Sequence, residues 1–256
     1  MDPQTLIRGR SADQAVITSA ASSGLGPVAE GPSVPSTKTL AHSRRSVWLL
    51  VLILVFLILN PLLEKNQMGE AVLLFSMYAT LISATRALSE RTRVRWPATL
   101  FAATSMLAMT INHFSPSRPL GIVNWTILAA FFGFISVGFF SYLGRAGAVT
   151  DDRIFVSVSL YLLLGMLWFS LYNLLEAIHP GSFVLQSTPL SSPRPPGTLL
   201  YLSLATLTTL GYGDIVPVTP IARMVAALEA VAGVLYIAIT VARLVAGYRS
   251  DKPETA

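Results

Sequence analysis

The chain has no cysteine and few charged residues, and both absences narrow what it can be. Of its 256 residues only 12% are charged, whereas 53% are apolar, and the mean hydropathy is +0.61. Without cysteine, neither disulfide bonds nor thiolate metal sites can form. A soluble domain carries about a quarter charged residues, so half of that share predicts a protein whose main solvent is lipid.

Histidine is also scarce, which argues against catalysis. The three histidines, His42, His113 and His179, lie far apart, and no nucleophile or metal-ligand spacing is visible. We therefore expect neither an enzyme nor a soluble cofactor. The net charge of +5 could suggest a nucleic-acid partner. In a membrane protein it indicates basic cytoplasmic loops instead, so no nucleic acid is expected.

Long apolar runs dominate the chain after its first residues. Residues 1–42 are rich in Ser, Thr, Ala, Pro and Gly without an apolar period, which predicts a disordered cytoplasmic tail. Runs close to the roughly 20 residues that span a bilayer follow at 46–63, 71–88, 94–113, 121–143, 154–178 and 221–248. The predicted fold class is an all-α membrane protein with six transmembrane helices.

The lysines and arginines predict the orientation of these helices. Most of the eighteen fall on the same side as the two termini, and the exceptions are Lys65, Arg118, Arg194 and Arg223. Basic residues are enriched in cytoplasmic loops. Both termini are therefore expected in the cytoplasm of a multi-pass protein of the plasma membrane, and the segment after residue 178 faces outward.

That outward segment contains the sequence TLTTLGYGDIVP at residues 206–217. The apolar residues 197–209 before it are too few to cross a bilayer, and they predict a re-entrant half-helix. Irregular backbone at membrane depth persists only inside protein or beside water. Gly211 and Gly213 accept backbone angles that let successive carbonyls point the same way. Such oxygens can replace the hydration shell of a cation, which the negative end of the half-helix also favours.

The stretch TLTTLGYGD resembles the signature of tetrameric potassium channels, whose filter commonly reads T-V-G-Y-G-D. The resemblance implies a homotetramer with one central pore, lined in each chain by Thr209, Leu210, Gly211, Tyr212 and Gly213. Potassium ions would bind at the carbonyls of the first four and at the Thr209 hydroxyl. Leu210 stands where the family has valine, which is expected to change the packing behind the filter more than the carbonyl ring.

The same resemblance implies supporting roles near the filter. Thr208 is expected to brace the end of the half-helix, and Asp214 to bond with the hydroxyl of Tyr201 at the outer mouth. Leu202 lies where many relatives have a second tryptophan, so one restraint on the filter is absent and slow loss of conduction is expected. Glu176 resembles the outer-helix glutamate that ties that helix to the inner helix in voltage-gated relatives.

AVAGVLYIAI, at residues 230–239, resembles the inner helix of voltage-gated and bacterial potassium channels. Gly233 takes the place of the family's hinge glycine, and it could equally serve close helix packing. Val234, Ile237 and Val241 share one helix face. That face is expected to line the inner cavity, where an apolar wall could close by dewetting.

Glu229 is the least expected acidic residue, because a charge inside the membrane is costly. It could bond to Thr206 or Ser203 on the half-helix, or it could add negative potential near the ion path. The structural role is the preferred interpretation, since intramembrane acids usually face protein partners.

These features divide the chain into the tail, a four-helix domain at 43–150, a pore domain at 151–248 and a short cytoplasmic tail at 249–256. No charged residue lies within 121–143, so a voltage sensor and steep voltage dependence are not expected. The leading hypothesis is a potassium-selective channel. A weakly selective cation channel, with a filter loosened by Leu210 and Leu202, and a non-conducting subunit that modulates another channel are the alternatives.

Overall fold

The computed structural model describes residues 37–63, 67–89, 95–145, 150–185, 188–189 and 197–250. The described residues from Lys38 onward belong to one compact unit. The helices are α2 (Thr37–Leu62), α3 (Gln67–Ser89), α4 (Arg95–Phe114), α5 (Arg118–Leu143), α6 (Asp151–Ile178), α7 (Thr198–Leu207) and α8 (Pro220–Ser250). Three short strands, β1 (Phe183–Leu185), β2 (Thr188–Pro189) and β3 (Ile215–Pro217), flank α7 in the sequence.

Five of the described helices are long and apolar enough to cross a membrane. The segments are Arg45–Leu62, Gly69–Leu88, Arg118–Leu143, Asp151–Ile178 and Pro220–Arg243. They support a helical, multi-pass membrane protein. Helix α4 has 20 residues but is not among the five, so the sixth spanning helix stays a prediction.

The two ends of the chain differ from the predicted boundaries. Helix α2 begins at Thr37, so residues 37–42 of the predicted tail are helical. Helix α8 continues to Ser250, past the predicted end of the pore domain. Residues 1–36 and 251–256, which make up the rest of the two predicted tails, lie outside the described residues.

The prediction of an all-α fold misses a short antiparallel sheet of order β2-β1-β3. In its register Val184 lies opposite Val216 and Leu185 opposite Ile215. Strands this short carry no periodic pattern that a sequence could reveal. Because β1 precedes α7 and β3 follows the TLGYGD sequence, their pairing joins the two ends of the segment between them.

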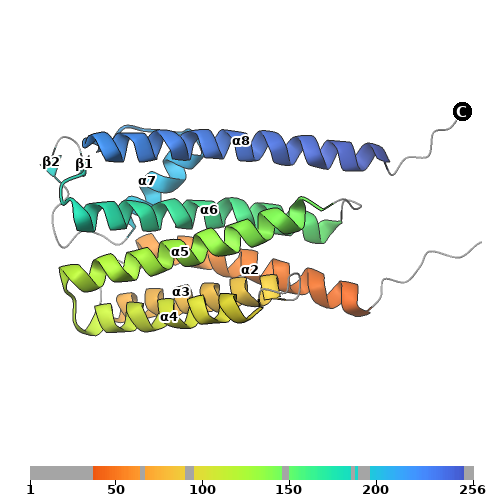
Figure 1. Ribbon diagram of the computed structural model, residues 1–256, viewed down its shortest axis with the longest axis horizontal. Coiled ribbons are helices and arrows are strands. Elements are labelled where there is room, and N and C mark those ends of the chain that lie inside the picture. Colours follow the sequence, from red (N-terminus) through yellow and green to blue (C-terminus); the bar gives the residue numbers. More distant parts are fainter. Residues whose placement is uncertain are drawn as a thin grey trace, which may run out of the picture. The chain divides into compact units, whose positions relative to one another are not determined.

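Helix α6 lies between two groups of helices. In Figure 1, α5 crosses one side of α6, whereas α7 lies between α6 and α8. Both α5 and α6 contribute fully buried side chains to the apolar core, among them Phe132 and Phe139 of α5 and Leu160 and Leu163 of α6. This apolar packing holds α6 against α5. Helices α7 and α8 in turn pack against α6.

Both ends of α6 are hydrogen-bonded to the preceding helices. At its start, Asp152 accepts hydrogen bonds from Ser46 Oγ of α2 at 2.6 Å and from Tyr142 Oη of α5 at 2.9 Å. At its end, the guanidinium of Arg118 donates to the last two carbonyl oxygens of α6 at 3.0 and 2.8 Å. Those carbonyls lack intrahelical donors, and a cation near them also stabilises the helix dipole. Helices α2 and α5 therefore hold α6 at both ends.

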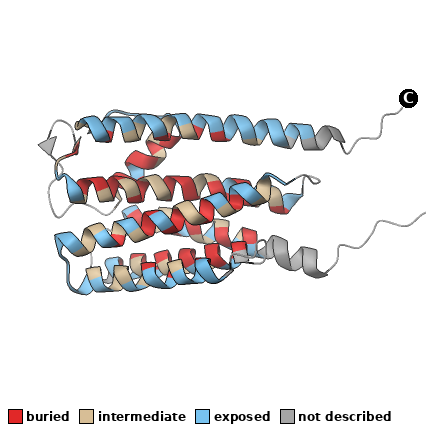
Figure 2. Cartoon of the chain, in the orientation of Figure 1, coloured by how far each residue is buried: buried red, intermediate tan, exposed pale blue. Residues whose placement is uncertain are grey.

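Helix α8 is far less covered than α6 in the single chain (Figure 2). Only 17% of its membrane-length segment is buried, against 56% for α6. Its exposed side chains are mostly large and apolar, including Leu228, Leu235 and Ile239. A helix that is apolar on every side is suited to lipid or to other protein chains.

Candidate functional site

Helix α7 is the predicted half-helix, and its C-terminus is closed by Thr208. The Thr208 hydroxyl donates to the Leu204 carbonyl at 2.7 Å, which satisfies one of the free carbonyls at a helix end. The chain then turns sharply, and the amides of Leu210 and Gly211 both donate to the Ala205 carbonyl, at 2.8 and 3.2 Å. The base of the 209–213 segment is thus tied to the last turn of α7.

The backbone of residues 209–213 alternates in handedness. Thr209, Gly211 and Gly213 have φ angles of +58°, +50° and +77°, whereas Leu210 and Tyr212 keep negative values. Glycine takes such angles freely, but a threonine with positive φ is strained. Within the described part of the chain, no hydrogen bond uses the carbonyl oxygens of residues 209–212. These oxygens are therefore uncommitted in the single chain.

Asp214, the residue directly after this segment, contacts the side chain of Tyr201. The Tyr201 hydroxyl donates to Asp214 Oδ1 at 3.2 Å. Partial desolvation and then the bond and charge of Asp214 raise the pKa of Tyr201, so the hydroxyl remains a donor at neutral pH. Asp214 is followed at once by β3, whose pairing with β1 holds the outer end of the segment.

Leu210 lies beside residues of α7. Together with Tyr201, Ala205 and Ile215 it lines a cavity of about 600 Å³ in the single chain. The side chain is 55% exposed, so this space remains open to a further partner. Leu202, by contrast, is buried in the core on another side of α7.

Glu229 is fully buried, and its carboxyl group joins three helices. One oxygen lies 2.6 Å from the Ser203 hydroxyl of α7, and the other accepts a hydrogen bond from Tyr172 of α6. Ser203 also donates to the Gly165 carbonyl of α6 at 2.8 Å. Of the two partners expected from the sequence, Ser203 makes the hydrogen bond to Glu229. Tyr172 was missed, because nothing local links two residues on separate helices.

Gly233 lies directly against the end of α7. A Cβ atom at this position would come within 2.0 Å of the Leu207 carbonyl oxygen. That oxygen also accepts a hydrogen bond from Tyr161 of α6 at 3.0 Å. This short distance leaves no room for a side chain at position 233. Close helix packing is one of the two roles that the sequence left open for Gly233.

The other predicted residues of α6 and α8 are placed as follows. Val234, Ile237 and Val241 are about half exposed and face away from the packed side of α8. Glu176 accepts a hydrogen bond from the Gly181 amide at 2.8 Å, in the turn before β1. This bond closes the turn after α6. The expected tie from Glu176 to the inner helix stays a prediction.

Comparison with known proteins gives one match. Residues 154–248 match a family model described as an ion channel. The match runs from the first turn of α6 almost to the end of α8, and it includes α7 and residues 209–213. No curated protein and no solved structure matches the chain. The part of the chain that holds the candidate site is thus similar to ion channels, and helices α2–α5 lie outside the match.

Proposed function

We propose that the chain forms a potassium-selective channel through which ions move passively, in a pore shared by four copies. The alternating φ angles of residues 209–213 are the observation that carries this proposal. In a strand, successive residues face opposite sides, whereas alternating handedness turns successive carbonyls toward one side. Uncommitted carbonyl oxygens in such a row are suited to replace the hydration shell of potassium.

In this proposal the ion sites are the carbonyls of Thr209, Leu210, Gly211 and Tyr212, with the Thr209 hydroxyl at the inner end. Helix α7 ends immediately before them, so its partially negative C-terminus stabilises a cation at the base of the filter. Potassium is the transported ion, and no soluble cofactor takes part.

A tetramer is proposed because one strand cannot surround an ion. Backbone polar groups at membrane depth need protein or water around them. In the single chain Leu210 and Tyr212 are 55% and 70% exposed, which leaves surface for neighbouring copies. Val234, Ile237 and Val241 would then line the inner cavity below the filter.

The proposed setting is the plasma membrane, with both termini in the cytoplasm. Steep voltage dependence is not expected, because residues 121–143 of α5 carry no charge. Arg118, at the start of α5, binds the end of α6. A signal received by α2–α5 would instead reach the pore through the contacts of Asp152 with α2 and α5 and through the contact of Arg118 with the end of α6.

The first test is rubidium uptake into vesicles that contain the purified protein, with barium as the blocker. We expect Gly211→Ala to abolish uptake, because alanine disfavours the φ of +50° on which the carbonyl row depends. Gly181→Ala is the matched control. Gly181 also has a positive φ, +84°, and open space around it, but it lies outside the filter. Equal loss of uptake in both variants would contradict the proposed role of residues 209–213.

The same vesicles separate the alternative functions. Equal uptake of sodium and rubidium would support the weakly selective cation channel instead of the potassium-selective one. Leu210, in place of the family's valine, would then be the reason for the looser filter. Absence of uptake, with altered currents when the chain is expressed beside another channel, would indicate a modulatory subunit.

Tyr201→Phe is expected to speed the decay of current during prolonged opening severalfold. The substitution keeps the ring but removes the hydrogen bond to Asp214. Because the pKa of Tyr201 is raised above its ordinary value of about 10, decay in the unmodified protein should not change between about pH 7 and about pH 9. Bilayer recordings measure the decay, and Tyr78→Phe, on α3, is the control. Identical decay in the Tyr201 and Tyr78 variants would count against the restraint.

A further inference from the structure

A groove lies between α2, α3 and α4, at the end where α2 begins and α3 finishes. Its volume is about 800 Å³. Among the described helices, α2 packs least closely against its neighbours at the backbone level, which leaves room for this groove. The proposed orientation places this end of the helices in the cytoplasmic half of the membrane.

Two arginines line the groove at this end. Arg45 is the first residue of the membrane-length segment of α2, and Arg86 lies in the last turn of α3. Both side chains are exposed in the single chain, so a ligand at the membrane surface can approach both. No acidic side chain is among the described residues that line the groove, and its charge is therefore positive.

Beyond the arginines the walls of the groove are largely apolar. Trp48 and Leu52 of α2 follow Arg45 at spacings that keep all three on one helix face. Trp48 and Phe75 of α3 are 61% and 74% exposed, so little protein covers these two rings. From Arg86 back to Phe75 the wall of α3 extends about 16 Å, which is close to the apolar thickness of one leaflet.

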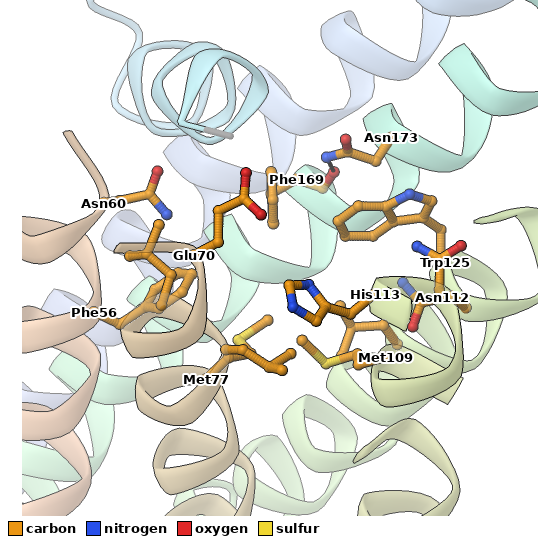
Figure 3. Close-up of a pocket in the computed structure, with 14 residues that line it drawn as sticks. Phe56, Asn60, Glu70, Met77, Met109, Asn112, His113, Trp125, Phe169 and Asn173 are labelled. Carbon is orange, nitrogen blue, oxygen red and sulfur yellow. Dashed lines mark hydrogen bonds between the residues drawn. The ribbon is translucent and has the colours of Figure 1, made fainter. Parts of the chain in front are cut away.

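The opposite ends of α2 and α3 carry the reverse charge. A second pocket there is lined by Asn60 of α2 and Glu70 of α3, and Figure 3 shows both side chains. No arginine or lysine is among the described residues that line this second pocket. An anion would meet a carboxylate there, whereas it would meet guanidinium groups in the groove. Charge complementarity therefore favours an anion at the arginine end alone.

Two simpler interpretations account for part of these observations. Arginines at cytoplasmic helix ends orient membrane proteins, and exposed apolar side chains contact ordinary lipid. Neither explains why both arginines line one hollow, which continues along an apolar wall as long as one leaflet is thick. A water-soluble phosphate would use the arginines but leave the apolar walls uncovered.

We propose that the groove binds an anionic phospholipid, with its headgroup beside Arg45 and Arg86 and an acyl chain along Trp48, Leu52 and Phe75. Arginine near the membrane surface attracts anionic headgroups, and its guanidinium group suits phosphate in particular. The acyl chain fills the space beside the loosely packed α2 and joins this helix to α3. The groove lies outside the ion-channel match, and lipid binding does not depend on conduction.

The test adds phosphatidylglycerol to the full chain purified in a neutral detergent, and native mass spectrometry measures the bound lipid. We expect phosphatidylglycerol to bind about tenfold more tightly than phosphatidylcholine with the same acyl chains. Arg45→Gln and Arg86→Gln should each weaken this binding about fivefold, as expected for one basic residue near an anionic headgroup. Equal binding of the two lipids by the unmodified protein would overturn the proposal.

Arg243→Gln is the matched control. Arg243 is an exposed arginine at the end of the membrane-length segment of α8, on the same side of the membrane in the proposed orientation, but it does not line the groove. Its loss should leave the affinity for phosphatidylglycerol unchanged. Equal weakening by Arg243→Gln and Arg86→Gln would show that overall positive charge holds the lipid, and it would overturn the site.

Ala79→Trp tests the apolar wall. Ala79 lines the groove on α3, so a tryptophan ring there would take the place of the acyl chain while both arginines remain. We expect tight binding to be lost, whereas Ala71→Trp, at an exposed position of α3 outside the groove, should leave it unchanged. Unchanged binding in Ala79→Trp, or displacement of the lipid by excess glycerol phosphate, would overturn the part assigned to the acyl chain.

The melting temperature separates lipid binding from folding. Phosphatidylglycerol should raise the melting temperature of the unmodified protein, but not that of a variant with both Arg45→Gln and Arg86→Gln. An equal rise in both proteins would overturn the role of the arginines. Absence of tight lipid binding, together with a changed oligomer size in Ala79→Trp, would identify a second copy of the chain as the occupant instead.

Discussion

Gly233→Ala is expected to abolish rubidium uptake and to destabilise the assembled protein. The new methyl group would lie 2.0 Å from the Leu207 carbonyl oxygen, a backbone atom that Tyr161 also holds in place. Relief requires a shift of α8 against the end of α7, and overpacking of this kind costs about 3 kcal/mol. Melting of the purified oligomer, followed by size-exclusion chromatography, measures the loss alongside uptake.

Gly133→Ala is the matched control, because it also adds a methyl group to a glycine inside a long apolar helix. Its Cβ would meet only the end of the Leu167 side chain at 3.9 Å, an ordinary contact. Alanine also favours a helix by up to about 1 kcal/mol relative to glycine. We expect unchanged or slightly higher stability. If Gly233→Ala altered opening while the melting temperature stayed unchanged, the hinge interpretation would replace the packing interpretation.

The second large effect concerns the carboxyl group of Glu229. The Ser203 hydroxyl has one hydrogen but two acceptors, the Gly165 carbonyl at 2.8 Å and Glu229 Oε1 at 2.6 Å. A neutral carboxyl group resolves the conflict, because it can donate to Ser203 while Ser203 donates to Gly165. Tyr172 donates to the other carboxyl oxygen. Neutrality also avoids the cost of a charge inside the membrane.

Glu229→Gln and Glu229→Leu should therefore behave differently. Glutamine places an amide NH2 group where the carboxyl O–H would donate to Ser203 and a carbonyl oxygen where Tyr172 donates, so rubidium uptake should stay within about twofold of the unmodified protein. Leucine removes both, leaves the buried Tyr172 hydroxyl without its partner, and should lower the stability of the oligomer by about 3 kcal/mol with loss of uptake. Uptake per assembled oligomer and the melting curve are measured for both variants.

The glutamine variant also separates the two roles that the sequence allowed for Glu229. If the side chain acts through negative potential near the ion path, glutamine should reduce uptake while stability is unchanged. Retained uptake and stability in Glu229→Gln, with failure of both in Glu229→Leu, would identify Glu229 as the group that joins α6, α7 and α8.

Much of the architecture could be predicted because it depends on local properties of the chain. Runs of apolar residues marked the five membrane-length helices, and the short run before the glycines marked α7. The positions of Gly211 and Gly213 marked the unusual backbone, since few other residues accept positive φ. The small sheet escaped prediction because β1 and β3 are too short for a periodic pattern. Helix α2 begins before the apolar run at residue 46 because its first turns are polar, so hydropathy did not mark them.

The contacts that hold the candidate site together could not be predicted in the same way. Glu229 meets Tyr172, Gly233 meets the Leu207 carbonyl, and Arg118 meets the end of α6, all across long stretches of sequence. Such pairs depend on how the helices pack, and an apolar helix surface leaves many alternative rotations open.

The sequence by itself determined three properties: the chain is apolar enough for a membrane, the positions of its long helices, and the residues of the glycine-containing turn after α7. Those properties arise from transfer free energy and backbone sterics, which act on neighbouring residues. Only the tertiary structure decided which polar atoms are paired and which are left without a partner, including the Oδ1 atoms of Asn60 and Asn124 in the described part of the chain. The physical reason is that pairing inside a membrane is set by the rotation and spacing of whole helices.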